Sequence, residues 1–271
     1  MSSAVAHAVE QLSPFGHAWM AAWPHSEVTI DGDRVHFAQP RCRLDAFGHR
    51  VHLPGLPTAA DTEAAWHAWC ERHRHHQVST CVLTWHVDHD TALPLAPRGW
   101  RLRPMMALYL AALPDPAPLR LRVLPLRGDE DGVVGLHEVA RVARGLPRGP
   151  AADLLRFRWL EQDHEDAYYV VSAPHYRVSA AAVVGSDGRE GMLVDAFSVP
   201  SDRHRRLASY AVTQVLHDYL RTTDGLLWAF IDPSSLAFPW LVRLGFVPSH
   251  HVMCLQRDVP WLGPHRLLGM H

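Results

Sequence analysis

Three arginines gather in the stretch VPSDRHRRLASYAV, residues 199–212. Apolar residues recur at helical spacing over 207–220, which predicts a helix that begins near Arg205 or Arg206. Arg203 and its neighbours then lie at the positive end of a helix, where repulsion costs a few tenths to about 1 kcal/mol for each cation. Backbone N–H groups at a helix start bind anions, so the cluster favours a site for a negatively charged ligand. The alternative is a solvated basic helix start that binds nothing.

The elements that would hold this cluster in place are predicted from the second half of the chain. Strand-like patterns precede the cluster, and Asp187-Gly188 predicts a tight hairpin turn between two of them. Hairpins join the middle strands and helices join the outer ones, which predicts an α+β fold with a mixed α/β sheet. The predicted strands are 119–126, 167–174, 177–185, 192–199, 225–231 and a last one around 250–258, and the further predicted helices are about 130–144, 151–164 and 235–245.

A proline-rich stretch separates this half from the first. Pro114, Pro116 and Pro118 alternate within it, and such a run disfavours both helix and sheet. We predict domains at 1–113 and 119–258, followed by a C-terminal tail at 259–271. In the first domain the pattern predicts a helix over 62–76 and strands over 77–85 and 101–113.

The two predicted domains end in similar sequences. PRGWRLRPMMALYL (97–110) and RLGFVPSHHVMCLQ (243–256) each place an Arg and a Gly-aromatic pair before a strand that carries Met at a matching depth. This similarity suggests a degenerate duplication. The alternative is two unrelated strands that each follow a glycine turn.

The composition is that of an ordinary globular protein. A net charge of -2, from 26 basic and 28 acidic residues, gives no reason to expect a nucleic acid or membrane partner. The N-terminus lacks the basic start and apolar run of a secretory signal, so we expect a cytoplasmic protein. The histidine-rich stretches 73–76 and 86–89 lack a second cluster at ligand spacing, so we expect no metal site. No C-x-x-C spacing is present, and we expect reduced thiols at Cys42, Cys70, Cys81 and Cys254.

Three signatures, in this order, resemble the GCN5-related N-acetyltransferase (GNAT) family. A strand–hairpin–strand run leads into VPSDRHRRLAS, which is similar to the family's Pro-x-x-Arg-x-x-Gly-x-Gly/Ala turn at Pro200 and Arg203. DPSSLAFPWLVRLGFVP (232–248) is similar to the family's later helix, which ends in Leu-Gly-Phe. The resemblance covers the C-terminal half well and implies a GNAT fold there, with a degenerate GNAT-like repeat in the N-terminal half.

This resemblance implies that acetyl-coenzyme A is the co-substrate. In the family, its pyrophosphate lies on the turn before the helix, where Arg203 matches the motif Arg and suits phosphate oxygens. Arg206 stands where the family usually has Gly, and it either places a further guanidinium on a phosphate or fills the site. Backbone groups at the end of the preceding strand would pair with the pantetheine arm. The implied coenzyme-binding residues are Phe197, Ser198, Val199, Arg203, His204, Arg205, Arg206, Leu207 and Ala208.

Two residues are catalytic candidates by the same resemblance. Asp195 lies five residues before Pro200, where many members carry an acid that removes a proton from the substrate amine. An alternative for Asp195 is an exposed acid or an ion pair with an arginine. Ser234 falls near the family's helix-opening Asn, too far along the helix to replace the Tyr that some members use to protonate the leaving thiolate. That Tyr position is Leu241 here.

We therefore expect an N-acetyltransferase that acetylates a primary amine of a small-molecule or peptide acceptor by direct attack. The second hypothesis is a catalytically inactive GNAT-like module that binds an acyl-coenzyme A or a protein partner. A third gives the N-terminal half a structural role as the contact surface of a homodimer, which is compatible with either.

Overall fold

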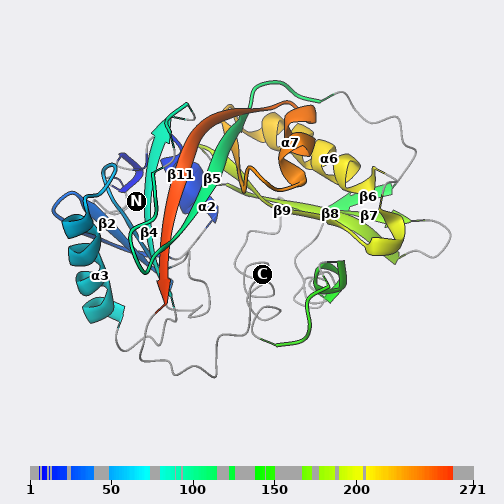
Figure 1. Ribbon diagram of the computed structural model, residues 1–271. Coiled ribbons are helices and arrows are strands. Elements are labelled where there is room, and N and C mark those ends of the chain that lie inside the picture. Colours follow the sequence, from blue (N-terminus) through cyan, green and yellow to red (C-terminus); the bar gives the residue numbers. More distant parts are fainter. Residues whose placement is uncertain are drawn as a thin grey trace.

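The computed structural model arranges the chain around one mixed sheet (Figure 1), as the α+β prediction requires. It describes residues 6, 8–10, 12, 14–22, 26–39, 49–73, 80–88, 90–92, 94–114, 122–125, 138–143, 145–149, 167–172, 177–186, 189–203 and 206–258. Residues 138–143 are helical. The other elements are α2 (Gly16–Ala22), β1 (Glu27–Asp31), β2 (Arg34–Ala38), β3 (Arg50–His52), α3 (Ala59–His73), β4 (Thr80–Asp88), β5 (Arg101–Leu110), β6 (Arg122–Pro125), β7 (Ala167–Ser172), β8 (Arg177–Ser186), β9 (Gly191–Ser198), η2 (Pro200–Asp202), α6 (Leu207–Thr222), β10 (Leu227–Ile231), α7 (Ala237–Arg243) and β11 (Phe246–Asp258).

Two strands, β5 of the first half and β11 of the second half, each pair with strands of the other half of the chain. Among the described residues the sheet has the order β1-β2-β3-β4-β11-β5-β10-β9-β8-β7-β6. β11 thus lies between two strands of the first half, and β5 separates β11 from β10. The boundary predicted at 114–118 lies largely outside the described residues, so the domain limits stay a prediction. The strands on either side of that boundary nevertheless form one continuous sheet.

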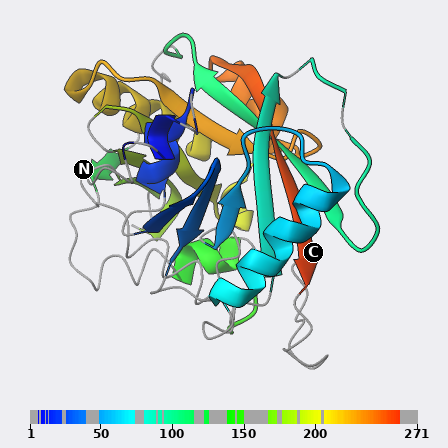
Figure 2. The same cartoon turned by 90° about the vertical axis from the view of Figure 1, so that its left-hand side faces the viewer.

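Helices cover both faces of this sheet. Along β5, Met106 and Leu108 pack in a core with α6 and α7, whereas Met105 and Ala107 pack toward α2 on the opposite face, as the period-two alternation of a strand requires. A third core lies beneath α3, which crosses the N-terminal strands in Figure 2, and contains the tryptophans at 66, 69, 85 and 100. The site described below therefore belongs to a sheet that is packed from both sides.

Most of the elements predicted for the second half are present. Strands β7 to β11 overlap their predicted ranges, and α6 begins at Leu207, next to the arginine cluster. The described part of the helix predicted over 130–144, residues 138–143, is helical. The helix predicted over 151–164 and the tail at 259–271 lie outside the described residues. The sequence pattern does not predict α2 and β1 to β3, because three to seven residues are too few for a clear period.

Steric crowding explains why the Leu-Gly-Phe signature needs a glycine at its central position. Gly245 has a φ of 95°, and a Cβ built there would lie 2.2 Å from the carbonyl oxygen of Ala112. The Ala111 N–H also donates to the Gly245 carbonyl at 3.1 Å. The motif therefore marks the place where the chain leaves α7 and passes close to the end of β5.

Several buried histidines lie in the N-terminal half. His36 in β2 is 2% exposed, and neither of its ring nitrogens has a hydrogen-bond partner among the described residues. Burial, reinforced by the positive charges of Arg72 and Arg34, lowers the pKa of His36 to about 4. Burial also lowers the pKa of His52 and, less strongly, that of His86. These side chains are therefore held neutral in the folded protein.

We predict that acid destabilises the protein through these groups. Unfolded His36 binds a proton near pH 6.5 and folded His36 only near pH 4, so lowering the pH through this interval favours the unfolded chain. Protonation of His36 alone should lower the free energy of unfolding by about 3 kcal/mol as the pH falls through this interval. Urea unfolding at several pH values measures the effect, with His36→Leu as the matched variant. An identical pH slope in the variant would contradict a neutral, buried His36.

Candidate active site

Strands β9 and β10 are parallel but separate soon after they meet. Their pairing covers only Leu227 with Gly191 and Trp228 with Met192, although β9 continues to Ser198. A β-bulge in β9 lies directly after the last paired residue, because Val183 pairs with Asp195 whereas the next residue of β8, Val184, pairs with Leu193. A bulge bends a strand and ends regular pairing. The bent part of β9 remains bonded to β8 on one edge, and its other edge has no strand partner among the described residues.

Apolar side chains surround the place where the two strands separate. They come from the end of β9, the first turns of α6 and the short helix α7. The Trp240 indole N–H donates to the Ser209 hydroxyl at 2.8 Å and thereby joins α7 to α6. The partly buried side chains packed around the α6 core include Leu193, Ala196, Ala208, Tyr210, Ile231, Phe238 and Trp240.

The turn from β9 to α6 ends in an N-cap residue that is an arginine. After the short helix η2, Arg206 is the N-cap residue with φ 60° and ψ 17°, and it makes no side-chain cap hydrogen bond. The first turn of α6 also contains no acid. Among the described residues, Arg206 is the one non-glycine with a positive φ. The backbone thus keeps the left-handed shape typical of glycine, although the residue is an arginine.

The other long helix shows the contrasting arrangement. At the start of α3, the Asp61 N–H donates to the Thr58 hydroxyl, and the Thr58 N–H donates to the Asp61 carboxylate at 3.0 Å. The Thr58 hydroxyl also donates to this carboxylate at 2.6 Å, and the hydrogen bonds that the carboxylate accepts from the hydroxyl and the N–H of Thr58 lower the pKa of Asp61. The strands that flank α3 also stay together, because the Leu53 N–H continues the ladder to the Thr84 carbonyl at 2.7 Å. The α3 start therefore carries its own negative charge and has no separated strands beside it.

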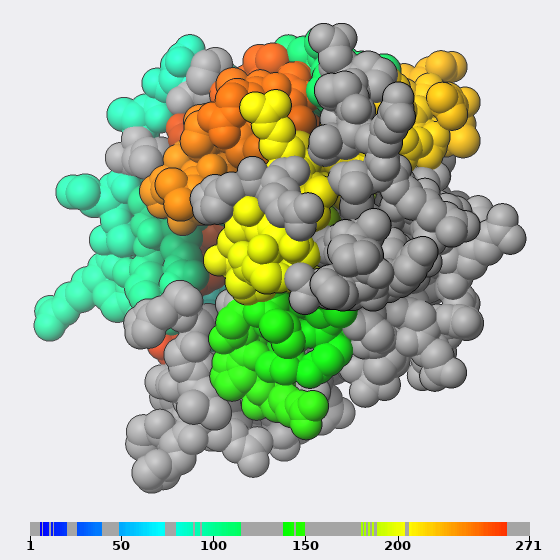
Figure 3. Space-filling model, turned by 90° about the vertical axis from the view of Figure 1, so that its right-hand side faces the viewer, coloured from blue at the N-terminus to red at the C-terminus, as the bar shows by residue number. Residues whose placement is uncertain are grey.

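Arg203 contacts a second helix. Its Nη2 donates to the Ala143 carbonyl at 2.6 Å, at the C-terminal end of the helix 138–143. Figure 3 shows the green atoms of residues 138–143 and 145–149 directly against the yellow atoms that precede and begin α6. The carbonyl end of this helix thus accepts a hydrogen bond from Arg203, which precedes α6 in the chain. This contact compensates part of the repulsion that the sequence predicts for a cation at a helix start.

The remaining predicted binding residues lie along the same strand and turn. Phe197 is buried, Ser198 and Val199 are half-buried, and Leu207 is buried in the α6 core. Ala208 lies at its edge. His204 and Arg205 lie outside the described residues. The structure therefore brings together those predicted binding residues that it describes, and their role as ligands stays a prediction.

The two catalytic candidates lie on different elements. Asp195 is half-buried on β9, and strand alternation directs it to the face opposite Ala196, away from α6. Ser234 is exposed before α7, and its hydroxyl donates to the Asp232 carboxylate at 2.6 Å. That bond and the Ser234 N–H lower the pKa of Asp232. Ser234 thus serves a local turn, whereas Asp195 lies on the strand that separates from β10.

Sequence reasoning missed the contribution of the first half to this region. Phe15 packs against Trp228 and Phe230 of β10, with ring centroids 5.7 and 5.1 Å apart. The Ala18 N–H of α2 donates to the Glu190 carboxylate, just before β9, at 3.3 Å. These contacts place Phe15 and α2 in a core on the face of the sheet opposite α6. Only the aromatic richness of the first half hints at them in the sequence.

Clusters of potential metal ligands and free thiols can be examined only in the described part of the chain. Within the described ranges, no group of three or more His, Cys, Asp or Glu side chains could hold a metal ion. Cys70, Cys81 and Cys254 are free thiols, as expected, while Cys42 lies outside those ranges. None of the described helices is both long and apolar enough to cross a membrane.

Comparison with known proteins connects this geometry to solved structures. The sequence matches no protein-family model, and no protein of curated function matches it significantly. A GCN5-related N-acetyltransferase from Kribbella flavida superposes with a TM-score of 0.58 at 16% identity, over 98% of each chain. A tandem GNAT protein from the clavulanic acid biosynthesis pathway gives 0.56 at 12% identity, over 94% of each chain. A functionally unknown conserved protein from Staphylococcus epidermidis gives 0.65 at 8% identity, over 87% of this chain and 95% of that one.

We predict that Arg206→Gly stabilises the ligand-free protein by about 1 kcal/mol. Glycine adopts the φ of 60° without the Cβ penalty, and residue 206 precedes the helix, so no interior helix propensity is lost. Arg206→Ala is the matched control, because it removes the same charge but keeps the Cβ. Urea unfolding of the three proteins measures the difference. Equal stability of the Gly and Ala variants would argue against a left-handed backbone at this residue.

Proposed function

The chain has the fold of the GCN5-related N-acetyltransferases, and from this premise we propose that it transfers an acetyl group from acetyl-coenzyme A to a primary amine. The observation that carries the proposal is a helix start whose N-cap residue, Arg206, makes no side-chain cap hydrogen bond, next to an edge of β9 that has no strand partner in the part of the chain that the structure describes. The first suits an anionic diphosphate, and the second suits an extended arm with amide groups. Coenzyme A contains both features in one molecule.

The reaction needs few groups from the protein. The amine lone pair attacks the thioester carbonyl carbon, the C–S bond breaks, and the coenzyme thiolate leaves. N–H groups on the bent part of β9 would stabilise the charge that develops on the carbonyl oxygen. Asp195 would accept the proton released by the amine. The position of the family's Tyr is taken by Leu241, which is 3% exposed in the core, so the thiolate leaves without an acid from that position.

The second candidate is a module that binds an acyl-coenzyme A or a protein partner without catalysis. The buried Leu241 and the arginine at the usual glycine position favour it. Coenzyme binding without acetyl transfer would support this candidate over the enzyme.

Calorimetric titration with acetyl-coenzyme A tests the proposal. We expect binding near micromolar, with one site in each chain, because the start of α3 carries its own carboxylate and β3 stays paired with β4. Coenzyme A without the acetyl group is the control for recognition of the phosphates. No binding at millimolar concentration would overturn the proposed function, and two sites in each chain would contradict the contrast between α3 and α6.

Asp195→Asn should slow acetyl transfer about 10²- to 10⁴-fold and leave acetyl-coenzyme A affinity unchanged, because it removes a proton acceptor and not a ligand of the phosphates. Release of the coenzyme thiol measures transfer to the best acceptor from a panel of primary amines. Asp224→Asn, at an exposed carboxylate between α6 and β10, is the matched control. Equal rates in the two variants would exclude Asp195 as the base.

A further inference from the structure

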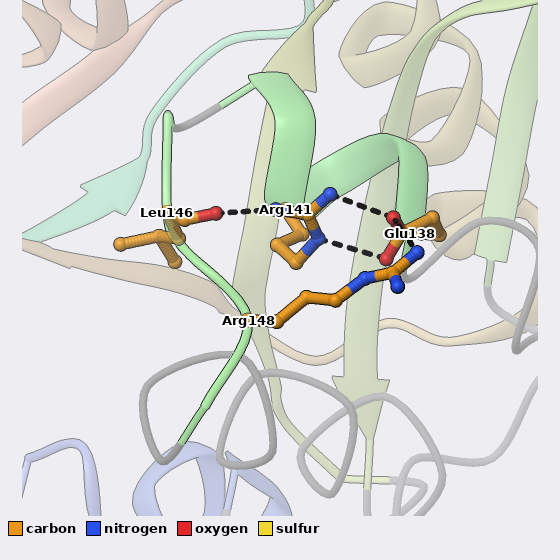
Figure 4. Close-up of polar contacts among 4 residues, drawn as sticks. All are labelled: Glu138, Arg141, Leu146 and Arg148. Atoms are coloured by element: carbon orange, nitrogen blue, oxygen red, sulfur yellow. Dashed lines mark hydrogen bonds and ion pairs between the residues drawn. The ribbon is translucent and has the colours of Figure 1, made fainter.

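The described residues of segment 138–149, which are 138–143 and 145–149, are held together by contacts with one another. Arg141 donates from Nε and Nη2 to both carboxylate oxygens of Glu138, at 2.8 and 2.6 Å, and from Nη1 to the Leu146 carbonyl at 2.5 Å (Figure 4). The helix ends in a Schellman motif, in which the Leu146 N–H bonds to the Arg141 carbonyl and the Gly145 N–H to the Val142 carbonyl. Gly145 has the positive φ of 65° that this motif requires. The segment is therefore a preformed unit.

One hydrogen bond joins the described residues of this unit to the turn before α6. It runs from Arg203 to the Ala143 carbonyl, an acceptor in the last helical turn that has no partner within the helix itself. Because the donor is charged, this bond is about twice as strong as one between neutral groups. Arg203 is otherwise exposed, and the bond occupies one of the five N–H groups of its guanidinium.

We infer that Arg203 is a positioning residue that docks segment 138–149 on the turn before α6 and couples this docking to anion binding. The inference rests on the proposed function for the identity of the anion, a phosphate of the coenzyme. One N–H of the planar guanidinium donates to the Ala143 carbonyl, while the others donate to phosphate oxygens. A guanidinium already held in place loses less freedom when the anion binds. By reciprocity, the bound anion stabilises the docked segment by the same factor.

Hydrogen exchange of the amides in 138–149 tests the docking without any ligand. Arg203→Ala should speed exchange at Gly145 and Leu146 about tenfold, because the segment loses its charged tether. Arg148→Ala is the matched control: it removes an exposed arginine of the same segment, whose nearest charged contact is Glu138 at 3.6 Å. It should leave the rates nearly unchanged. Unchanged rates in Arg203→Ala, or equal increases in both variants, would overturn the docking role.

The coupling is tested with acetyl-coenzyme A and with inorganic pyrophosphate, each at saturation as judged by calorimetry. Either probe should slow exchange in 138–149 of the wild-type protein about tenfold and should have no such effect in Arg203→Ala. Arg203→Lys should recover part of the effect, because an ammonium keeps the charge without the planar fork. Faster exchange on binding, or equal slowing in Arg203→Ala, would refute the coupling. If the wild-type protein binds neither anion, the proposed function and the coupling both fail, while the ligand-free comparison still decides the docking.

Discussion

The backbone hydrogen bonds of β5 and β11 hold both halves of the chain in one sheet. β5 is bonded to β11 from Arg101 to Leu110 and to β10 from Met106 to Tyr109, and the outer edge of β11 is bonded to β4. A central strand can leave such a sheet only by breaking two ladders, which would expose N–H and C=O groups in a packed interior. The cores on the two faces depend on this arrangement, because side chains of β5 alternate between them. We therefore treat the two halves as one cooperative unit.

The pairing of β10 with β5 and of β9 with β8 explains how the sheet tolerates the separation of β9 from β10. β10 is supported along its far edge by β5, so it does not need β9 beyond Met192 to remain in the sheet. β9 is supported in the same way by β8. Each strand can therefore leave one edge unpaired where the two separate. Gly245 allows the close packing of β11 beside β5, because only a residue without a Cβ lets the start of β11 pass so close to Ala112.

Local features of the site were predictable from sequence, whereas its long-range contacts were not. Helical spacing predicted the start of α6, and the hairpin pattern predicted the antiparallel pairing of β8 with β9, because both signals come from neighbouring residues; the turn residues Asp187 and Gly188 themselves lie outside the described residues. The pairing of β11 with β4 joins residues about 170 positions apart, and no local pattern encodes it. Arg203 could be recognised as a cation at a helix start, but its partner Ala143 is 60 residues upstream and uses a backbone oxygen, which any residue type provides. The left-handed conformation of Arg206 could not be predicted for a related reason, because an arginine in the sequence does not indicate a positive φ.

The position of β11 has a consequence for synthesis on the ribosome. β4 and β5 are made early, yet the strand that belongs between them is the last one, ending at Asp258. Until that strand emerges, both neighbours present unpaired edges, which are templates for association with other chains. Such a high contact order makes folding slow, because long loops must close before the central ladders form. A nascent chain of this protein is therefore expected to depend on chaperone protection until β11 has emerged from the ribosome.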